Sequence, residues 1–244
     1  MSAYCYSIEK YELMSDSLDK LEEGCKCLRN TFEHIQEQLS SVQKIVPNNS
    51  PNQIKEKLNR WENNLKRLEK DHIANSFVVT EQPPNTVMLY ASKGTKLHRS
   101  SQNLFGVCIR FLGWTENDKG KIKVMPEVLH LNNDGKEDTR LKIIQIQKNL
   151  CNSDTEKPME FTENKALARF PEISVNNEKG QKRTEDCRAC RYSIRFKIYM
   201  KNGLKKYELN KLSLPFGVPG DKKDIYLLEK KIVMERTYMD PVRI

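Results

Sequence analysis

The segment between residues 192 and 218 constrains the fold more than any other part of the chain. Across residues 192–201 apolar side chains alternate with mostly cationic ones, which is typical of a strand with one buried face and one basic face. Asn202-Gly203 then predicts a tight type I′ turn, and residues 204–218 predict a second strand. Its apolar positions are Tyr207, Leu209, Leu212, Leu214 and Phe216. Because a hairpin cannot bury its apolar face alone, the segment predicts a larger all-β body and a negatively charged partner outside it.

The positive charge of the chain is concentrated around this hairpin. The 244 residues carry a formal net charge of +9, and the stretch from Lys165 to Lys206 alone has twelve Lys or Arg against four Asp or Glu. A one-sided field of this kind attracts phosphate polymers or acidic proteins. The alternative interpretation is a solvated basic surface without a specific partner.

The cysteines and the apolar segments indicate the environment of the protein. Seven cysteines lack a disulfide-framework spacing, and the sequence has neither a signal-type leader nor an apolar run near the ~20 residues that span a bilayer. These features predict a reducing compartment and no membrane. Cys187 and Cys190 are spaced as C-x-x-C, but no second ligand pair accompanies them, so we expect two reduced thiols and no metal.

No catalytic motif is recognisable in the sequence. It lacks a glycine-rich phosphate loop and a G-x-S-x-G element, and its four histidines are dispersed. The sequence therefore predicts a protein that is not an enzyme and that has no cofactor and no small-molecule substrate.

Two helices are predicted before the strands. Apolar residues recur at three-and-four spacing from residue 11 to 46, and again from Ile54 to His72, with a turn at residues 47–51. The two helices are expected to pair antiparallel, and His72 is expected to be a packing residue rather than a ligand. Because the first seam is about twice as long as the second, pairing would leave apolar surface exposed, which predicts self-association or further helices.

The pattern changes after Asn75 from a helical period to alternation. Several short strand patterns follow, separated by turn residues, and together they favour a β-sandwich or a barrel. They occupy residues 76–79, 87–90, 104–112, 121–124, 128–131, 141–146 and the hairpin itself.

Three short motifs occur in an order that resembles a known family. They are Asn75-Ser76-Phe77-Val78-Val79 followed by Glu81-Gln82-Pro83, then Lys121-Ile122-Lys123-Val124, then Leu212-Ser213-Leu214-Pro215. The chain from Tyr4 to Val218 is thereby similar to the signal transducer and activator of transcription (STAT) family. In that family a helix ends in S-F-V-V-x-x-Q-P, the next domain carries K-V-K-V, and a late strand ends in S-L-P-V-V-V.

The resemblance implies an α+β fold in three parts. Residues 1–75 resemble the third and fourth helices of the STAT four-helix coiled coil, as an antiparallel helical hairpin. Residues 76–220 resemble its immunoglobulin-like all-β DNA-binding barrel, and residues 221–244 a C-terminal tail or a remnant of the linker. The first two helices and the SH2 domain are expected to be absent, as in a truncated product or a shortened member.

The resemblance also implies three DNA-contacting places. They are the two-lysine strand, the loop at residues 179–191 and the segment at residues 217–223. The loop carries Cys187-Arg188-Ala189-Cys190 where the family has an acidic pair, and Asp221 stands where the family usually has an asparagine. The implied site residues are Lys121, Lys123, Lys179, Lys182, Arg183, Arg188, Arg191, Asp221, Lys222 and Lys223.

The function implied by the resemblance is that of a transcription factor in cytokine-type or JAK-STAT-like signalling. We expect it to bind duplex DNA, to occur in the cytoplasm and the nucleus, and to bind proteins, including a homologous STAT chain, through the helical seam. The alternative is a truncated protein-interaction module that acts through the coiled coil as a modulator of a full-length relative.

Overall fold

The computed structural model describes residues 3–47, 51–87, 104–131, 144–146, 157–162, 165–173, 175–177, 191–202, 205–219 and 225–239. These residues form an α+β fold of helices and antiparallel sheets, as predicted. The chain divides into two compact units. The first contains Met1–Val78, Phe111–Lys119 and Thr162–Ala166, and the second contains Val79–Arg110, Gly120–Phe161 and Leu167–Ile244.

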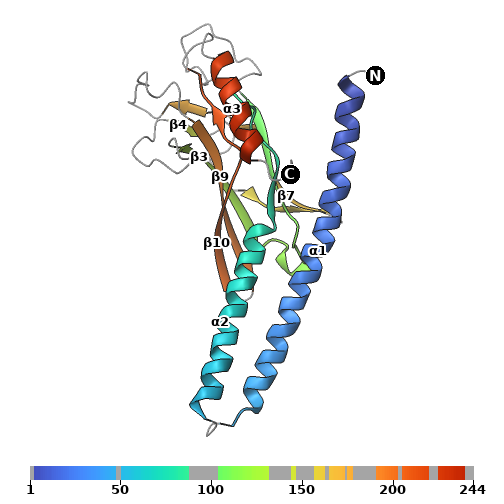
Figure 1. Cartoon of the computed structure of the whole chain (residues 1–244), viewed down its shortest axis with the longest axis vertical. Helices are drawn as coiled ribbons and strands as arrows, with labels where there is room; N and C mark the ends of the chain where they lie inside the picture. The colour runs from blue at the N-terminus through green and yellow to red at the C-terminus, as the bar shows by residue number, and fades with distance from the viewer. Residues whose placement is uncertain are drawn as a thin grey trace. The chain divides into compact units, whose positions relative to one another are not determined.

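The first unit is built on a pair of antiparallel helices (Figure 1). They are α1 (Ala3–Ile45) and α2 (Asn52–Asn75). Leu58 and Leu65 of α2 are buried, and the ring of His72 lies 5.6 Å from that of Phe32 in α1. The His72 ring nitrogen also lies 3.1 Å from the carbonyl oxygen of Cys25. The predicted helical hairpin is therefore confirmed, and His72 is a packing residue within it.

A short segment from the β-rich part of the sequence completes this unit. Residues Phe111–Lys119 include the 3-10 helix η2 (Glu116–Asp118). Thr115 and Asp118 form a capping box at its N-terminal end. The Phe111 ring stacks on that of Phe77, with centroids 4.2 Å apart. Leu112 donates a backbone hydrogen bond of 2.8 Å to the carbonyl of Ser76. The helical unit thus extends beyond the predicted boundary at residue 75.

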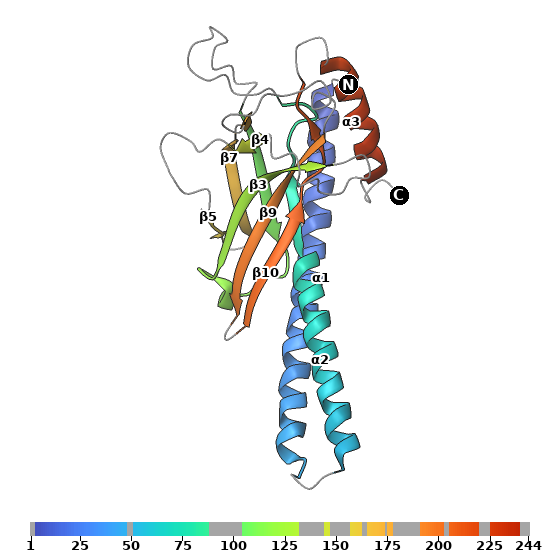
Figure 2. The same ribbon diagram turned by 90° about the vertical axis from the view of Figure 1, so that its left-hand side faces the viewer.

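The described strands form three sheets, which lie mostly in the second unit (Figure 2). The sheet with the order β10-β9-β3-β5, in which β11 also pairs with β9, has the most strands, and we call it the larger sheet. The other two sheets have the orders β1-β2-β7-β6 and β4-β8. Their bounds are β1 Phe77–Glu81, β2 Phe105–Phe111, β3 Ile122–Leu131, β4 Ile144–Ile146, β5 Lys157–Pro158, β6 Glu160–Phe161, β7 Ala166–Ile173, β8 Val175–Asn177, β9 Arg191–Asn202, β10 Lys205–Leu212 and β11 Phe216–Gly217.

The hairpin predicted from the sequence is the centre of the larger sheet. Strands β9 and β10 pair antiparallel, from Lys205 opposite Asn202 to Leu212 opposite Arg195. The predicted apolar face is buried, with Tyr192, Ile194, Phe196, Ile198 and Met200 each no more than 1% exposed. Phe196 contacts Phe170 of β7, and Phe216 contacts Phe105 of β2. These contacts join the two larger sheets through their apolar faces, as in a β-sandwich.

The C-terminal part of the described chain is a helix, α3 (Ile225–Met239). Leu228 and Ile232 are buried, and a Cβ added to Gly217 would lie 2.5 Å from the Leu228 side chain. Glycine is therefore needed where α3 packs on β11. Arg236 donates hydrogen bonds to the carbonyls of Pro215 and Pro83, at 2.7 and 2.8 Å, and its burial lowers its pKa to about 10. In the described part of the chain, no helix is long and apolar enough to cross a membrane.

Candidate nucleic-acid interface

A row of three lysines crosses the larger sheet at the turn end of the hairpin. Lys206 of β10 is the register partner of Lys201 in β9, and the backbone N–H of Lys201 donates to the carbonyl of Lys121, 3.1 Å away. All three side chains are exposed. Because side chains alternate across a strand, these lysines lie on the face opposite the buried Met200 and Tyr207. We call Lys121, Lys201 and Lys206 the lysine row.

The next row along the sheet adds a further cation and an aromatic ring. Tyr199 of β9 pairs with Glu208 on one side and with Lys123 of β3 on the other. Lys123 is exposed, and Tyr199 is 36% exposed. These two rows therefore contain four lysines but only one carboxylate, that of Glu208, and the exposed ring of Tyr199 lies among them.

Farther from the turn, the basic face is neutralised. Glu127 of β3 forms ion pairs with Arg195 and with Lys197, the latter at 2.8 Å. Burial also lowers the pKa of Arg195. The cationic face predicted for the whole strand is thus confined to the hairpin's turn end, because a carboxylate from the neighbouring strand, distant in sequence, pairs with two of its members.

The lysine row costs the isolated fold some stability. Directly opposed side chains on neighbouring strands have Cβ atoms roughly 5 Å apart, and like charges at that separation repel. Within the described residues, Lys121, Lys201 and Lys206 form no ion pair that would offset this repulsion. A polyanion bound at the row would remove the repulsion, so the geometry favours such a ligand.

Arg191, another predicted site residue, is engaged elsewhere. Its guanidinium lies 3.1 Å from the carboxylate of Glu235 in α3, and its side chain is only 12% exposed. It is therefore unavailable to a phosphate in this arrangement. The residues predicted in the two loops lie outside the described residues, namely Lys179, Lys182, Arg183, Arg188, Asp221, Lys222 and Lys223, and so do Cys187 and Cys190.

The register separates the predicted site into two ends of the sheet. Arg191 pairs with Leu131 of β3 and with Gly217 of β11, so the flanks of the two predicted loops meet there. Lys121, in contrast, lies beside Lys201, ten residues farther along β9. At ~3.3 Å per residue this is about 30 Å from Arg191. The two-lysine strand and the described flanks of the two loops therefore lie at opposite ends of the sheet.

Sequence reasoning did not include Lys201, Lys206 and Tyr199 among the site residues. The alternation of β9 placed Lys201 and Tyr199 on the outward face, but only the register with β10 and β3 brings them beside Lys206 and Lys121. The hairpin itself brings Lys201 beside Lys206. The register with β3, in contrast, joins strands that are distant in the sequence, and it could not be read from either of them.

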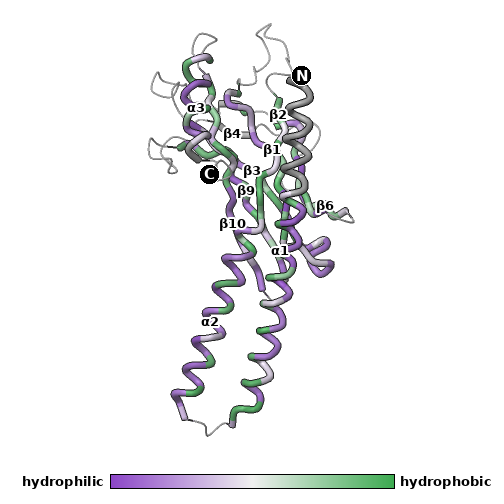
Figure 3. The backbone as a smooth tube through the Cα atoms, turned by 45° about the vertical axis from the view of Figure 1, so that its right-hand side comes forward, coloured by the Kyte–Doolittle hydropathy of each residue, from purple (hydrophilic) through white to green (hydrophobic). Residues whose placement is uncertain are grey.

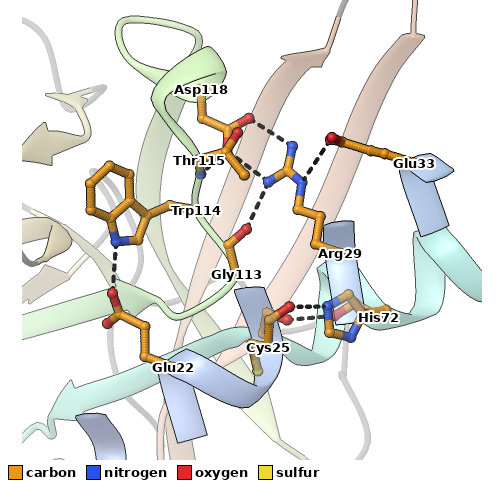
Figure 4. Close-up of polar contacts among 10 residues, drawn as sticks. Glu22, Cys25, Arg29, Glu33, His72, Gly113, Trp114, Thr115 and Asp118 are labelled. Carbon is orange, nitrogen blue, oxygen red and sulfur yellow. Dashed lines mark hydrogen bonds and ion pairs between the residues drawn. The ribbon is translucent and has the colours of Figure 1, made fainter. Parts of the chain in front are cut away.

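A second polar cluster lies in the helical unit and is buried (Figure 4). The Arg29 guanidinium of α1 donates two hydrogen bonds to the Asp118 carboxylate, at 2.7 and 2.9 Å, and one of 2.8 Å to the Gly113 carbonyl. Nearby, the indole of Trp114 donates to Glu22 at 2.8 Å. Arg29 and Asp118 are almost completely buried and satisfy one another, so this cluster has a structural role.

Comparison with known proteins adds no assignment. No family model matches the chain, and no curated protein is significantly similar to it. Within the described residues, no group of three or more His, Cys, Asp or Glu is arranged to hold a metal ion.

Proposed function

We propose that this protein binds duplex DNA and acts as a STAT-like transcription factor. The observation that carries the proposal is the lysine row, together with Lys123 and Tyr199 on the adjacent positions. Lysines contact phosphates without regard to sequence, and each contact releases counterions from the duplex. A flat strand face with four lysines therefore suits the backbone of a nucleic acid.

The order of the elements supports the STAT-like part of the proposal. A helical hairpin is followed by a two-sheet body, which we infer to be the immunoglobulin-like DNA-binding barrel of that family. Two of the motifs on which the resemblance rests also touch: the Leu214 N–H donates a 2.8 Å hydrogen bond to the Gln82 side chain. A factor of this kind would occur in the cytoplasm and the nucleus and would act downstream of a cytokine-type receptor.

The proposal is tested by titrating a fluorescent duplex with the full-length protein at several salt concentrations. We expect affinity to fall steeply with salt. Reversing the lysine row, as Lys121→Glu, Lys201→Glu and Lys206→Glu together, should weaken binding and lower the slope of log K against log salt by about 2 to 3, since each lost phosphate contact contributes roughly 0.9.

Two further variants make the result specific. Lys230→Glu and Lys231→Glu change exposed lysines of α3 and should leave affinity and slope nearly unchanged, apart from a small effect of net charge. Lys182→Glu with Arg183→Glu tests the loop at residues 179–191. Absent or salt-independent binding would rule out the proposal, and loss of binding only with the loop variant would assign the interface to the loop instead of the lysine row.

A further inference from the structure

Each helix of the hairpin carries an exposed apolar stripe with a seven-residue repeat. On α1 the stripe is Leu21, Leu28, Ile35 and Val42, which are 41–53% exposed, and on α2 it is Ile54, Trp61 and Leu68, which are 44–63% exposed. Apolar positions recur along both helices between hydrophilic ones (Figure 3). The buried contacts between the helices use a different set of positions, including Leu58 and Leu65. About half of the apolar positions of each helix therefore take no part in the contact between the two helices.

The two stripes lie on the same side of the hairpin. Ile35 and Val42 follow the facing residues Phe32 and Leu39 by three positions, and Trp61 and Leu68 follow Leu58 and Leu65 by three. An offset of three residues turns a side chain by about 60° from the contact line. Because the helices are antiparallel, the two rotations bring both stripes to one side. Together they form an exposed apolar strip along the line where the two helices meet, which we call the hairpin groove.

The opposite side of the hairpin is closed by polar contacts. There the residues four positions after the facing ones meet: Gln36 donates to Glu69 at 2.7 Å, and Gln43 donates to Glu62 at 3.0 Å. The hydrogen bonds from Lys66 and Gln43 hold the pKa of Glu62 below its usual value. One side of the hairpin is thus sealed by hydrogen bonds between the helices, whereas the groove side presents large apolar side chains.

The hairpin groove is large enough for a specific contact. Leu21 and Val42 are 21 residues apart, which is about 30 Å at 1.5 Å per residue, and two helices side by side span roughly 20 Å. The rectangle that encloses both stripes has an area of about 600 Å², which is at the upper end of the ~300–600 Å² of the largest apolar patch on a typical monomer. It approaches the ~800 Å² per partner of a standard interface. One helix of about 20 residues would cover it.

The charges beside the groove indicate what that helix carries. From Gly24 to Ile45 the outer flank of α1, beyond its stripe, has no Asp, Glu, Lys or Arg, although 31% of the chain is charged, and the exposed Lys20 lies at the N-terminal end of this flank. That flank consists of Gly24, Cys27, Thr31, His34, Gln38, Ser41 and Ile45. The corresponding flank of α2 carries three exposed cations, Lys57, Arg60 and Arg67, and one exposed carboxylate, Asp71. Charge depletion around an apolar centre is typical of protein interfaces.

We propose that the hairpin groove binds one amphipathic helix of another protein, with apolar residues at heptad spacing and acidic residues along the edge next to α2. Carboxylates on that edge pair with Lys57, Arg60 and Arg67, and an uncharged edge faces α1. A second copy of this chain fits less well. It places the three cations of α2 either against the same cations or against the uncharged flank of α1, and neither arrangement is complementary.

Two synthetic peptides test the proposal with the full-length protein. Both are helices of about 20 residues with Leu at heptad spacing, and one carries Glu and the other Lys at the edge positions. In fluorescence anisotropy titrations we expect the Glu peptide to bind and the Lys peptide to bind at least ~10-fold more weakly. Trp61→Glu should weaken the binding of the Glu peptide by about 30-fold or more, because the exposed indole is the central apolar anchor.

Reversing the charges on α2 distinguishes specific binding of an acidic helix from non-specific binding of an apolar peptide. Reversing Lys57, Arg60 and Arg67 to Glu should invert the preference, so that the Lys peptide binds more tightly than the Glu peptide. Lys70→Glu changes an exposed charge on the opposite side of α2 and should leave both affinities within about 2-fold. Since no DNA is present, failure of this test is distinguishable from failure of the DNA-binding proposal.

Two results would overturn the inference. The first is equal binding, or no binding, of the two peptides to the unmodified protein. The second is a dimer, seen in sedimentation velocity, that dissociates when Trp61 is changed to Glu but not when the Glu peptide is added. The groove would then be filled by a second copy of this chain.

Discussion

Lys211 lies on the inward face of the larger sheet, on the same side as Tyr207 and Leu209 and opposite Phe196 in the register. Burial lowers the pKa of its ammonium group. The next residue, Leu212, was expected on the apolar face but is 47% exposed. The apolar pattern predicted from residue 207 to 216 therefore changes phase in the middle, and a lysine stem fills a position that simple alternation would give to an apolar residue.

The change of phase has a local cause at Ser213. Its hydroxyl accepts a 2.9 Å hydrogen bond from the N–H of Ile194 and donates one to the carbonyl of Leu214. The side chain of Ser213 thus takes part in the pairing with β9 where β10 ends, and Phe216 of β11 returns to the core. Alternation predicts the strand, but an interruption by a serine hydroxyl has no signature in apolar periodicity.

We predict that Lys211→Met stabilises the protein by about 0.5–1 kcal/mol at pH 7, because a thioether replaces a partly desolvated ammonium group. The pKa of Lys211 is lower in the folded than in the unfolded state, so the penalty is present at neutral pH. It disappears as pH rises through the lowered pKa toward the usual 10.5. Urea unfolding of both proteins between pH 7 and 10.5 should give a difference that narrows with pH. Lys230→Met, at an exposed position of α3, is the control. A difference that stays constant with pH would contradict the explanation.

At the scale of elements, the ion pair of Arg29 and Asp118 attaches the 3-10 helix η2 to α1. The two residues are 89 positions apart. In the sequence Arg29 is an ordinary charged residue beside an apolar seam, and Asp118 lies between the predicted strands at residues 104–112 and 121–124. Periodicity predicted α1, α2, β1 to β4 and the hairpin of β9 and β10, whereas β5 to β8 and α3 lie in stretches for which it predicted no element. It does not predict which charged side chains become buried between them, and these are what fix the segment Phe111–Lys119 to the helices.

We predict that Arg29→Met or Asp118→Leu alone lowers the free energy of unfolding by about 3–5 kcal/mol, since each leaves its partner buried without full compensation. The double variant Arg29→Met with Asp118→Leu should recover a large part of that loss. Denaturant unfolding of the four proteins gives the coupling energy directly. Glu116→Gln, which removes an exposed ion pair with Lys119, should change stability by less than about 1 kcal/mol. Additive effects of the two buried substitutions would contradict the predicted coupling.

At the scale of the whole molecule, the helical unit depends on a segment that the sequence assigns to the β-rich part. Beyond residue 75, the unit includes Phe111–Lys119, which supplies Asp118, Gly113 and Trp114 to side chains of α1. A boundary drawn where helical periodicity ends therefore cuts through a packed unit. Each of the two units is made of several separate stretches of the chain, so neither is contiguous in sequence.

This interdependence predicts that Arg29→Met has different effects in the whole protein and in a fragment of residues 1–75. In the whole protein the substitution leaves Asp118 buried and unpaired. In the fragment Asp118 is absent and Arg29 is hydrated, so the same change should be neutral within about 0.5 kcal/mol or slightly stabilising. Thermal unfolding followed by circular dichroism measures both, and the fragment should also unfold at a temperature at least about 10 °C lower. Equal destabilisation in the two proteins would mean that Arg29 acts within the helical hairpin alone, and that the segment Phe111–Lys119 contributes nothing to its stability.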